Sequence, residues 1–567
     1  MHKWTVLWDE LTVPTPQSRK HAWMFLGIVI LGFFLRFWHL GSLAEGMLYD
    51  EAYKGLDAIA IRESGERPVF LDWNGGREAL VAYTVAAAQS FLNHTITSVR
   101  VVSAFYGSLA IIVLYLFVSR LWSRDVALIS AFLMAISKFH IIHSRLGVRA
   151  GHFSFFEVAT LCFLAAGLYA KRRRNLWLVL AGLFAGLGFH TYIAYRVFPV
   201  IVVAFLLSKE RLLRLKSQWK GALAGLVLAA VILAPLAVFY VQHYKSMTDR
   251  MKRTAVWNQK GKNRDESPAR LVMEATLNTV AMFNFKGDRI ERHNVDSEPM
   301  LSPFAGPFFL LGCLVTLVCI RKPYALFLIL YLFLTLLPGF LSVDSPNTGR
   351  VQGCIPPAMI LCGLGLAACA RLATRWSAPL ATLILAAALG GSACTGINDA
   401  LFRYPERMDN LPPQVSDIWG LDREPARAAD LMNRLGSRCA AFATPQFFFH
   451  SALEYLTYSK SEHQLFVPAT NVAGRAGGKV AVIFLQQNPQ MNLWFLRDDD
   501  GKRFYKWWNQ RYGMTTPWIR AAVRSAYGGN PQMMKTSDQP LLQILRRRYP
   551  NGRYLDFQTF AVYITRK

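Results

Sequence analysis

The segment WMFLGIVILGFFLRFW, residues 23–38, is followed by the segment LYDEAYK, residues 48–54. The first segment is apolar over a length close to the roughly 20 residues that a helix needs to cross a bilayer. Asp50 and Glu51 therefore lie at a membrane surface, where carboxylates are unfavourable unless something solvates or uses them. We predict a catalytic role for this pair. The structural alternative is that Asp50 caps a short surface helix over residues 51–62.

Long apolar runs continue through most of the chain. Of its 567 residues, 53% are hydrophobic, which exceeds the share in an ordinary soluble protein. The net charge of +27 does not indicate a nucleic-acid partner, because the basic residues cluster at the ends of the apolar runs, where they set orientation and contact anionic lipid. The pattern predicts a polytopic α-helical membrane protein with about 11 spans. The predicted spans are residues 23–38, 97–119, 125–142, 152–170, 175–190, 194–208, 221–241, 304–320, 323–341, 351–370 and 377–394.

The distribution of basic residues predicts the orientation of these spans. Lysine and arginine accumulate in the short loops on the cytoplasmic side of a membrane. If the N-terminus is cytoplasmic, the basic clusters, among them Lys171–Arg174, all fall on the cytoplasmic side. The outer side then receives the Asp50 loop and the other polar clusters, so we predict a site assembled from several outer loops.

The chain divides into two predicted domains. Residues 1–395 form a membrane domain, whose first outer loop, residues 41–96, carries helices at 51–62 and 77–92 that lie in the interface, with a turn at 72–76 between them. In residues 396–567 the long apolar runs end, and shorter helix and strand patterns follow. This pattern predicts an α/β domain outside the cytoplasm. Its predicted elements are helices at 424–435 and 503–512 and strands at 440–443, 480–485 and 557–564.

The outer corner at His143–His152 carries two arginines. Arg145 and Arg149 are four residues apart, so in a helix they would share one side and form a two-guanidinium fork suited to a phosphate. The alternative is that both side chains reach lipid headgroups.

Further outer loops supply additional cations. Arg196 and Tyr192 share a helical face, although tyrosine here also fits an aromatic belt. Arg350 opens a span at its N-terminal end, where the helix dipole favours an anion. The polar stretch at residues 287–294 contains His293, a further candidate for the site. The predicted phosphate ligands are Arg145, Arg149, Arg196, Arg350 and Lys54.

Carboxylates and distributed cations on one face indicate a class of reaction. A base at Asp50 can take a proton from an acceptor hydroxyl while arginines neutralise a leaving phosphate. Transfer of a sugar from a lipid-linked phosphate fits this division of roles. The sequence carries no P-loop, dinucleotide fingerprint or zinc-protease motif, which argues against nucleotide-driven chemistry.

The acidic pair in the first outer loop, the many spans and the polar tail resemble the GT-C superfamily of membrane glycosyltransferases. The resemblance is strongest to glycosyltransferase family 39, which contains the protein O-mannosyltransferases and the aminoarabinose transferases of lipid A. It covers residues 1–395 and includes the Ser-Arg corner at residues 143–149. It implies an inverting transferase that uses a polyprenyl-phosphate sugar, with Asp50 as base or metal-bound acid and Glu51 beside it.

The sequence departs from this family at one position. Many relatives carry a second aspartate shortly after the Ser-Arg corner, where this chain has Gly151 and His152. Either Glu157 or His152 takes that role, or this chain lacks it, and His293 is a further candidate for a second acid or a metal ligand. A bound divalent metal is therefore left open.

The resulting prediction is a multi-pass enzyme of a bacterial-type inner (plasma) membrane, with a cytoplasmic N-terminus and an extracytoplasmic C-terminal domain. Its expected partners are a polyprenyl-phosphate sugar donor, a lipid, glycan or protein acceptor, and the surrounding membrane lipids. Two alternatives are a lipid-linked sugar transporter or flippase and a non-catalytic membrane assembly subunit. The sugar and the acceptor are not specified by the sequence.

Overall fold

The structure is a computed structural model of the whole chain. It describes residues 2–16, 18–63, 65–71, 76–244, 248, 251–252, 254–258, 267–411, 423–458, 463–486, 511, 515, 517–518, 521, 525–526, 538–557 and 560–565. The turn predicted by the residues around Asn74 and the helix predicted at 503–512 lie outside these residues, apart from Gly76 and Arg511.

Within the described residues, six helices are long and apolar enough to cross a membrane, or seven if one bent pair forms a single span. Five shorter apolar helices of 10–17 residues accompany them. The structure therefore shows a multi-helix membrane protein, and the predicted count of about 11 spans stays a prediction. The spanning helices are α2 (Arg19–Phe37), α5 (Ile96–Leu121), α8 (Ala150–Tyr169), α12 (Trp219–Gln242), α17 (Ile355–Thr374) and α18 (Ala378–Asn398).

The bent pair consists of α6 (Arg124–Ile136) and α7 (Lys138–Arg145), which meet at 55°. Ser137 causes the break, because its extended backbone ends α6 and its side chain accepts a hydrogen bond from the His140 N–H at the start of α7. The break leaves carbonyls at the end of α6 without helical partners. Arg36 of α2 satisfies two of them through its guanidinium, those of Met134 at 3.1 Å and Ala135 at 3.1 Å.

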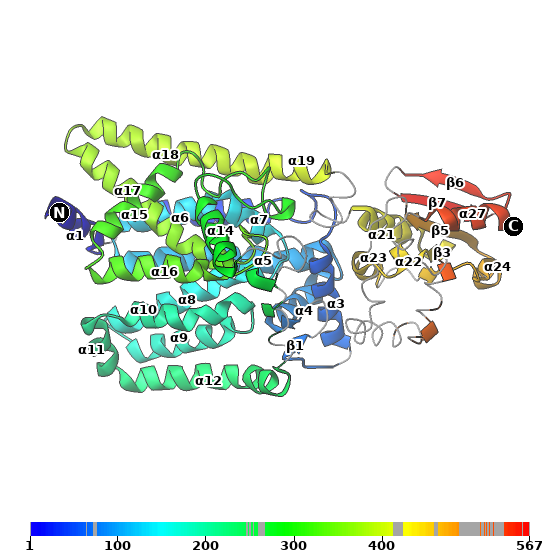
Figure 1. Cartoon of the computed structure of the whole chain (residues 1–567), viewed down its shortest axis with the longest axis horizontal. Coiled ribbons are helices and arrows are strands. Elements are labelled where there is room, and N and C mark those ends of the chain that lie inside the picture. The colour runs from blue at the N-terminus through cyan, green and yellow to red at the C-terminus, as the bar shows by residue number, and fades with distance from the viewer. Residues whose placement is uncertain are drawn as a thin grey trace.

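The remaining helices of the membrane region pack around these spans (Figure 1). They are α1 (His2–Thr12), α9 (Arg174–Gly188), α10 (Phe198–Leu206), α11 (Lys209–Ser217), α14 (Pro268–Ala281), α15 (Gly306–Val318), α16 (Pro323–Phe340) and α19 (Tyr404–Asp409), with short helical turns η1 (Ile193–Val197), η2 (Val256–Asn258), η3 (Glu291–His293), η4 (Gln352–Cys354) and η5 (Asp399–Arg403).

The first outer loop forms two helices joined by a short hairpin. The predicted helix over 51–62 is α3 (Tyr49–Glu63), and Asp50 lies in its first turn. The predicted helix over 77–92 begins three residues later, as α4 (Leu80–Leu92), because residues 77 and 78 belong to a strand. The hairpin strands are β1 (Phe70–Leu71) and β2 (Arg77–Glu78), which pair antiparallel.

The C-terminal region, residues 423–565, contains a five-stranded sheet in the order β4-β3-β5-β7-β6. β3, β4 and β5 are parallel, whereas β7 runs antiparallel to both β5 and β6. Buried apolar residues of these strands and of the covering helices form a core separate from that of the membrane helices. The strands are β3 (Cys439–Ala443), β4 (His463–Leu465), β5 (Val480–Gln486), β6 (Arg553–Asp556) and β7 (Phe560–Thr565), and the helical elements are α21 (Arg423–Leu435), η6 (Gly436–Arg438), α22 (Pro445–Phe448), α23 (Ser451–Thr457), α24 (Val472–Arg475) and α27 (Gln539–Arg548).

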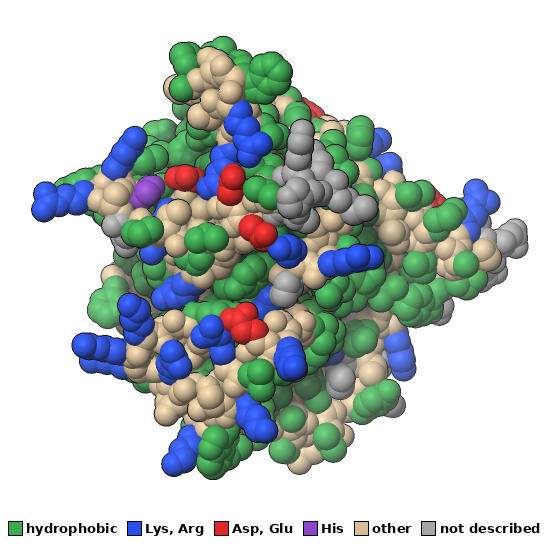
Figure 2. Space-filling model, turned by 90° about the vertical axis from the view of Figure 1, so that its left-hand side faces the viewer, with side chains coloured by type: hydrophobic (Ala, Val, Ile, Leu, Met, Phe, Trp, Pro, Cys, Tyr) green, Lys and Arg blue, Asp and Glu red, His purple; other side chains and the backbone are tan. Residues whose placement is uncertain are grey.

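Different elements lie at the two ends of the molecule. The C-terminal region packs beside α3 and α4 at one end, while α1 and α11 lie at the other (Figure 1). Figure 2 shows the α1 and α11 end, where many Lys and Arg side chains gather among few acidic ones. Basic residues at one end are what the positive-inside rule expects of a cytoplasmic side, and the predicted orientation stays a prediction.

Candidate active site

The α3 helix is fixed by the carboxylate of Glu51, which is completely buried. Its Oε1 accepts hydrogen bonds from Arg100 Nε at 2.9 Å and from the Gly147 N–H at 2.7 Å. Its Oε2 accepts from Arg100 Nη2 at 3.1 Å and from the Leu48 N–H at 2.8 Å. Glu51 therefore ties α3 to α5 and to the corner between α7 and α8, and its lone pairs are used in doing so.

Asp50, the neighbouring residue, is only half-buried and lies among charged groups. The Lys54 ammonium, one helical turn later, donates to the Asp50 backbone carbonyl at 2.7 Å. Burial lowers the pKa of Lys54 to about 7, with Asp50 opposing this shift and Arg77 and Arg149 adding to it. The structure thus places one carboxylate and several cations around the start of α3.

Arg149 extends this charged group toward the membrane helices. Its guanidinium forms an ion pair with Glu78 of β2 at 3.1 Å and lies over the ring of Tyr192 at 5.7 Å. Tyr240 of α12 donates to the other oxygen of Glu78 at 3.3 Å, and Arg196 lies over the Tyr240 ring at 4.8 Å. A chain of polar contacts therefore leads from Arg149 to Arg196.

Arg196 and Arg350 line the same cavity, although they are far apart in the sequence. The cavity has a volume of about 480 Å³ and lies between η1, the end of α16 and the segments 251–252 and 254–257. Lys252 is the third cation in its wall, and most of the other lining side chains are apolar, among them Trp257 and Leu341. Such a cavity suits an amphiphile with an anionic group.

The predicted fork of Arg145 and Arg149 does not form. α7 ends at Arg145 and α8 begins at Ala150, so the two residues do not share a helical face. The Arg145 guanidinium instead donates to the carbonyls of Leu35, Arg36, Trp38 and His39, at 2.8–3.3 Å, at the end of α2. Arginine at the C-terminal end of a helix satisfies open carbonyls and the helix dipole, which explains the difference.

His293 belongs to a buried pair with Asp288. Its Nδ1 lies 3.0 Å from Asp288 Oδ2, which also accepts from the backbone N–H and the hydroxyl of Thr348, both at 2.7 Å. Burial would raise the pKa of Asp288, but the hydrogen bonds it accepts, first from His293, outweigh this and lower it. Burial lowers the pKa of His293, while Asp288 and the more distant Asp50 oppose that shift. The sequence indicated His293 but gave no sign of its partner.

The two candidates for a second acid on α8 lie deeper. His152 and Glu157 are both buried, and Glu157 is close to Tyr331 and Cys354. Within the described ranges, no three His, Cys, Asp or Glu side chains come together as metal ligands would. The residues around Asp50 that the structure describes therefore supply no ready-made metal cage. The second acid stays a prediction, and a bound metal stays open.

Glu78, Tyr240 and Lys252 were not predicted from the sequence. Glu78 is isolated in the sequence, and only the fold brings it between Arg149 and Tyr240. Tyr240 resembles any aromatic residue near the end of a span. Lys252 lies in the polar segment that follows α12, where nothing in the sequence distinguishes it from its basic neighbours.

Comparisons with known proteins address the fold and the class. Residues 79–239 match the family model described as dolichyl-phosphate-mannose-protein mannosyltransferase. A search of curated proteins found no match. The structure is similar to ArnT from Cupriavidus metallidurans bound to undecaprenyl phosphate, with a TM-score of 0.51, 14% identity and coverage of 83% of this chain and 94% of that chain. It is also similar to the oligosaccharyltransferase AglB from Archaeoglobus fulgidus, in complex with an inhibitory peptide and a dolichol-phosphate, with a TM-score of 0.50, 13% identity and coverage of 82% and 69%.

These matches confirm the predicted resemblance to the GT-C membrane glycosyltransferases and to family 39. At this level of identity the similar structures establish the fold that the chain shares with them. The chemistry of this chain follows from its own residues.

Proposed function

We propose that this protein transfers a sugar from a polyprenyl-phosphate donor to an acceptor hydroxyl at the outer face of the membrane, with inversion at the sugar carbon. One observation carries the proposal. The half-buried Asp50 carboxylate and the Arg149 guanidinium both act electrostatically on Lys54. From Arg149, contacts through Glu78 and Tyr240 lead to Arg196, which lines an apolar cavity together with Arg350.

The cavity suits the donor lipid in two respects. Its apolar wall accommodates a prenyl chain, and Arg196, Arg350 and Lys252 supply cations for the phosphate. The similar ArnT structure is bound to undecaprenyl phosphate, which supports a lipid phosphate as the ligand class. Arg350 also contacts Asp344, at 3.8 Å, so binding would exchange an exposed carboxylate for a phosphate.

The proposed reaction needs a base and a stabilised leaving group. Asp50 accepts the proton of the acceptor hydroxyl as its oxygen attacks the anomeric carbon. The bond from that carbon to the phosphate oxygen breaks, and the polyprenyl phosphate leaves with one additional negative charge, which the surrounding cations stabilise. Glu51 does not take part directly in this scheme, because its oxygens hold Arg100, Leu48 and Gly147.

The test is a transfer assay with the full-length protein in membrane vesicles. Radiolabelled polyprenyl-phosphate sugars are supplied in turn, with matched nucleotide sugars as controls, and the anomeric configuration of the product is determined. The proposal predicts transfer from one lipid-linked donor, none from nucleotide sugars, and an inverted product. Transfer with retention, or uptake of the intact donor without cleavage, would exclude the proposed reaction, and the second result would favour a transporter.

A further inference from the structure

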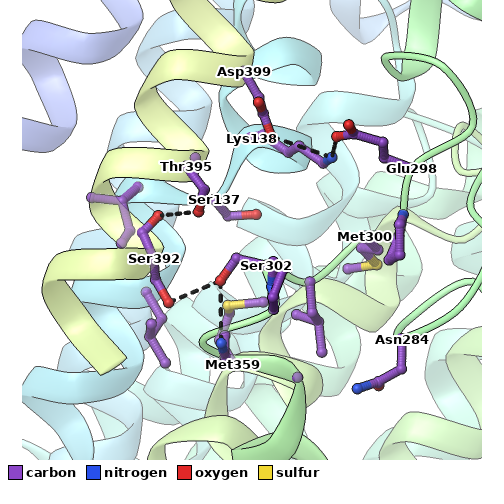
Figure 3. A pocket seen from close by; sticks show the side chains of 18 of the residues that line it. Ser137, Lys138, Asn284, Glu298, Met300, Ser302, Met359, Ser392, Thr395 and Asp399 are labelled. Carbon is purple, nitrogen blue, oxygen red and sulfur yellow. Dashed lines mark hydrogen bonds and ion pairs between the residues drawn. The ribbon is translucent and has the colours of Figure 1, made fainter. Parts of the chain in front are cut away.

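A second cavity, of about 530 Å³, lies elsewhere among the membrane helices. It is bounded by the break between α6 and α7, the outer half of α18 and residues 298–307 (Figure 3). None of the residues that line it also lines the cavity of Arg196 and Arg350. It is therefore a separate site.

The polarity of this cavity changes with depth. At one end, the charged side chains of Lys138, Glu298 and Asp399 meet, as Figure 3 shows. Ser392 precedes Asp399 by seven residues on the same helix, which places it about 10 Å deeper at 1.5 Å per residue. There the hydroxyls of Ser302 and Ser392 are 2.9 Å apart.

Apart from Asn284 and the hydroxyls of Ser137, Ser302, Ser392 and Thr395, the rest of the cavity is lined by apolar side chains and backbone. Leu133, Met300 and Met359 are among its lining residues. α18 forms one wall, and it is a peripheral helix, because only 22% of its spanning window is buried inside the protein. The cavity therefore offers a charged end at the membrane surface and an apolar interior, which is the polarity of a membrane lipid.

The charged end contains both signs. Lys138 contacts Glu298 at 2.8 Å and Asp399 at 3.5 Å. Arg403 contacts the same two carboxylates, at 2.7 Å and 2.9 Å, and Asp296 at 3.5 Å. Of these groups, two cations, Lys138 and Arg403, and two carboxylates, Glu298 and Asp399, line the cavity. Asp296 lies outside the lining and also pairs with Arg407 at 3.3 Å. A headgroup with a phosphate and an ammonium group matches this balance of charges, whereas a purely anionic headgroup leaves the two carboxylates without a counter-charge.

We propose that this cavity binds a zwitterionic, amine-bearing glycerophospholipid. Its phosphate faces Lys138 and Arg403, its ammonium group faces Glu298 and Asp399, and one acyl chain extends past Ser392 into the apolar interior. The cavity shares no lining residue with the donor cavity, so this proposal does not rest on the proposed sugar transfer.

The bound lipid also lies behind part of the candidate active site. Lys138 is on α7, the helix whose His143 ring lies 5.2 Å from the ring of His293. Glu298 belongs to the same loop as Asp288 and His293. The Asn294 side chain connects the two ends of this loop, because it donates to the backbone carbonyls of Asp288 and Glu298, at 3.1 Å and 2.8 Å. The lipid would therefore support the loop that holds His293.

The experiment is native mass spectrometry of the full-length protein, delipidated and then mixed with equal amounts of phosphatidylethanolamine and phosphatidylglycerol. The proposal predicts that one phosphatidylethanolamine is retained in preference, by about tenfold. Equal retention of the two lipids, preferential retention of phosphatidylglycerol, or retention of neither would overturn the proposal. This comparison needs no variant, so it does not depend on the folding of a mutant.

Two variants then locate the site. Ser392→Trp fills the cavity and should reduce the retained phosphatidylethanolamine by about tenfold. Leu383→Trp is the matched control, because Leu383 lies on the same helix, is 65% exposed and does not line the cavity. Equal loss or equal retention in the two variants would place the lipid elsewhere on the protein.

Discussion

The ring of Tyr455, in the C-terminal region, packs directly against Gly55 of α3. A Cβ atom added to Gly55 would lie 2.3 Å from Tyr455 Cε2, so only glycine permits this approach. The Tyr455 hydroxyl lies 2.8 Å from the Ser98 hydroxyl and donates to the Thr95 carbonyl at 3.0 Å. Gly55 directly follows Lys54, so the C-terminal region contacts the helix that carries Asp50.

This contact predicts that the C-terminal region positions α3 for activity. Tyr455→Phe removes the hydroxyl contacts but keeps the ring, and we expect it to lower the free energy of unfolding by about 1 kcal/mol with a small loss of activity. Gly55→Ala forces the Tyr455 ring away from α3. We expect this variant to lower kcat strongly and to change KM little. Steady-state kinetics and thermal unfolding in detergent measure both effects. Normal kcat in Gly55→Ala would show that the contact does not position the site.

Breaking the buried pair of Glu51 and Arg100 should destabilise the protein. Arg100→Met leaves the Glu51 carboxylate buried without its main partner, which typically costs about 3–5 kcal/mol. A fall in Tm, measured by thermal unfolding, is the expected result. Arg214→Met, which removes an exposed pair with Glu210, is the control and should leave Tm nearly unchanged. Similar Tm values in the two variants would contradict a structural role for Glu51.

Removing a cation from the donor cavity should weaken donor binding. Arg196→Gln or Arg350→Gln removes a charge-assisted contact worth about 1.5–3 kcal/mol, which corresponds to a rise in KM of about 10-fold to 100-fold. Arg145→Gln is the informative comparison, because Arg145 holds carbonyls of α2 and should affect Tm rather than donor KM. The assignment of the cavity fails if Arg145→Gln raises donor KM and the other two variants do not.

The pKa of Lys54 predicts a pH dependence. Because burial lowers this pKa to about 7, Lys54 is charged below that pH and neutral above it. A contribution of Lys54 to phosphate binding should therefore be present at low pH and lost as the pH rises through 7, so donor KM should increase over this range. Lys54→Arg keeps its charge at all these pH values and should flatten the profile. An unchanged profile in Lys54→Arg would exclude Lys54 as the titrating group.

The membrane class, the helices beside Asp50 and the cavity cations Arg196 and Arg350 could be predicted, because apolar length, charge distribution and cations near span ends are local features of the sequence. The four-residue spacing of Arg145 and Arg149 could not show whether they share one helix. α7 ends at Arg145, whose side chain binds carbonyls at the end of α2, and this contact is not visible in the sequence. The pairing of Asp288 with His293 and the position of Glu78 were also beyond the sequence, since tertiary contacts decide them.

The most direct test of the account is the activity of Asp50→Asn. The variant keeps the shape of the side chain and removes the base, so transfer from the active polyprenyl-phosphate sugar should fall by about 10²-fold to 10⁴-fold while Tm stays the same. Asp430→Asn, which changes a 59% exposed carboxylate in the C-terminal region, is the matched control and should transfer normally. Full activity of Asp50→Asn in a correctly inserted protein would contradict the central claim that Asp50 is the catalytic base.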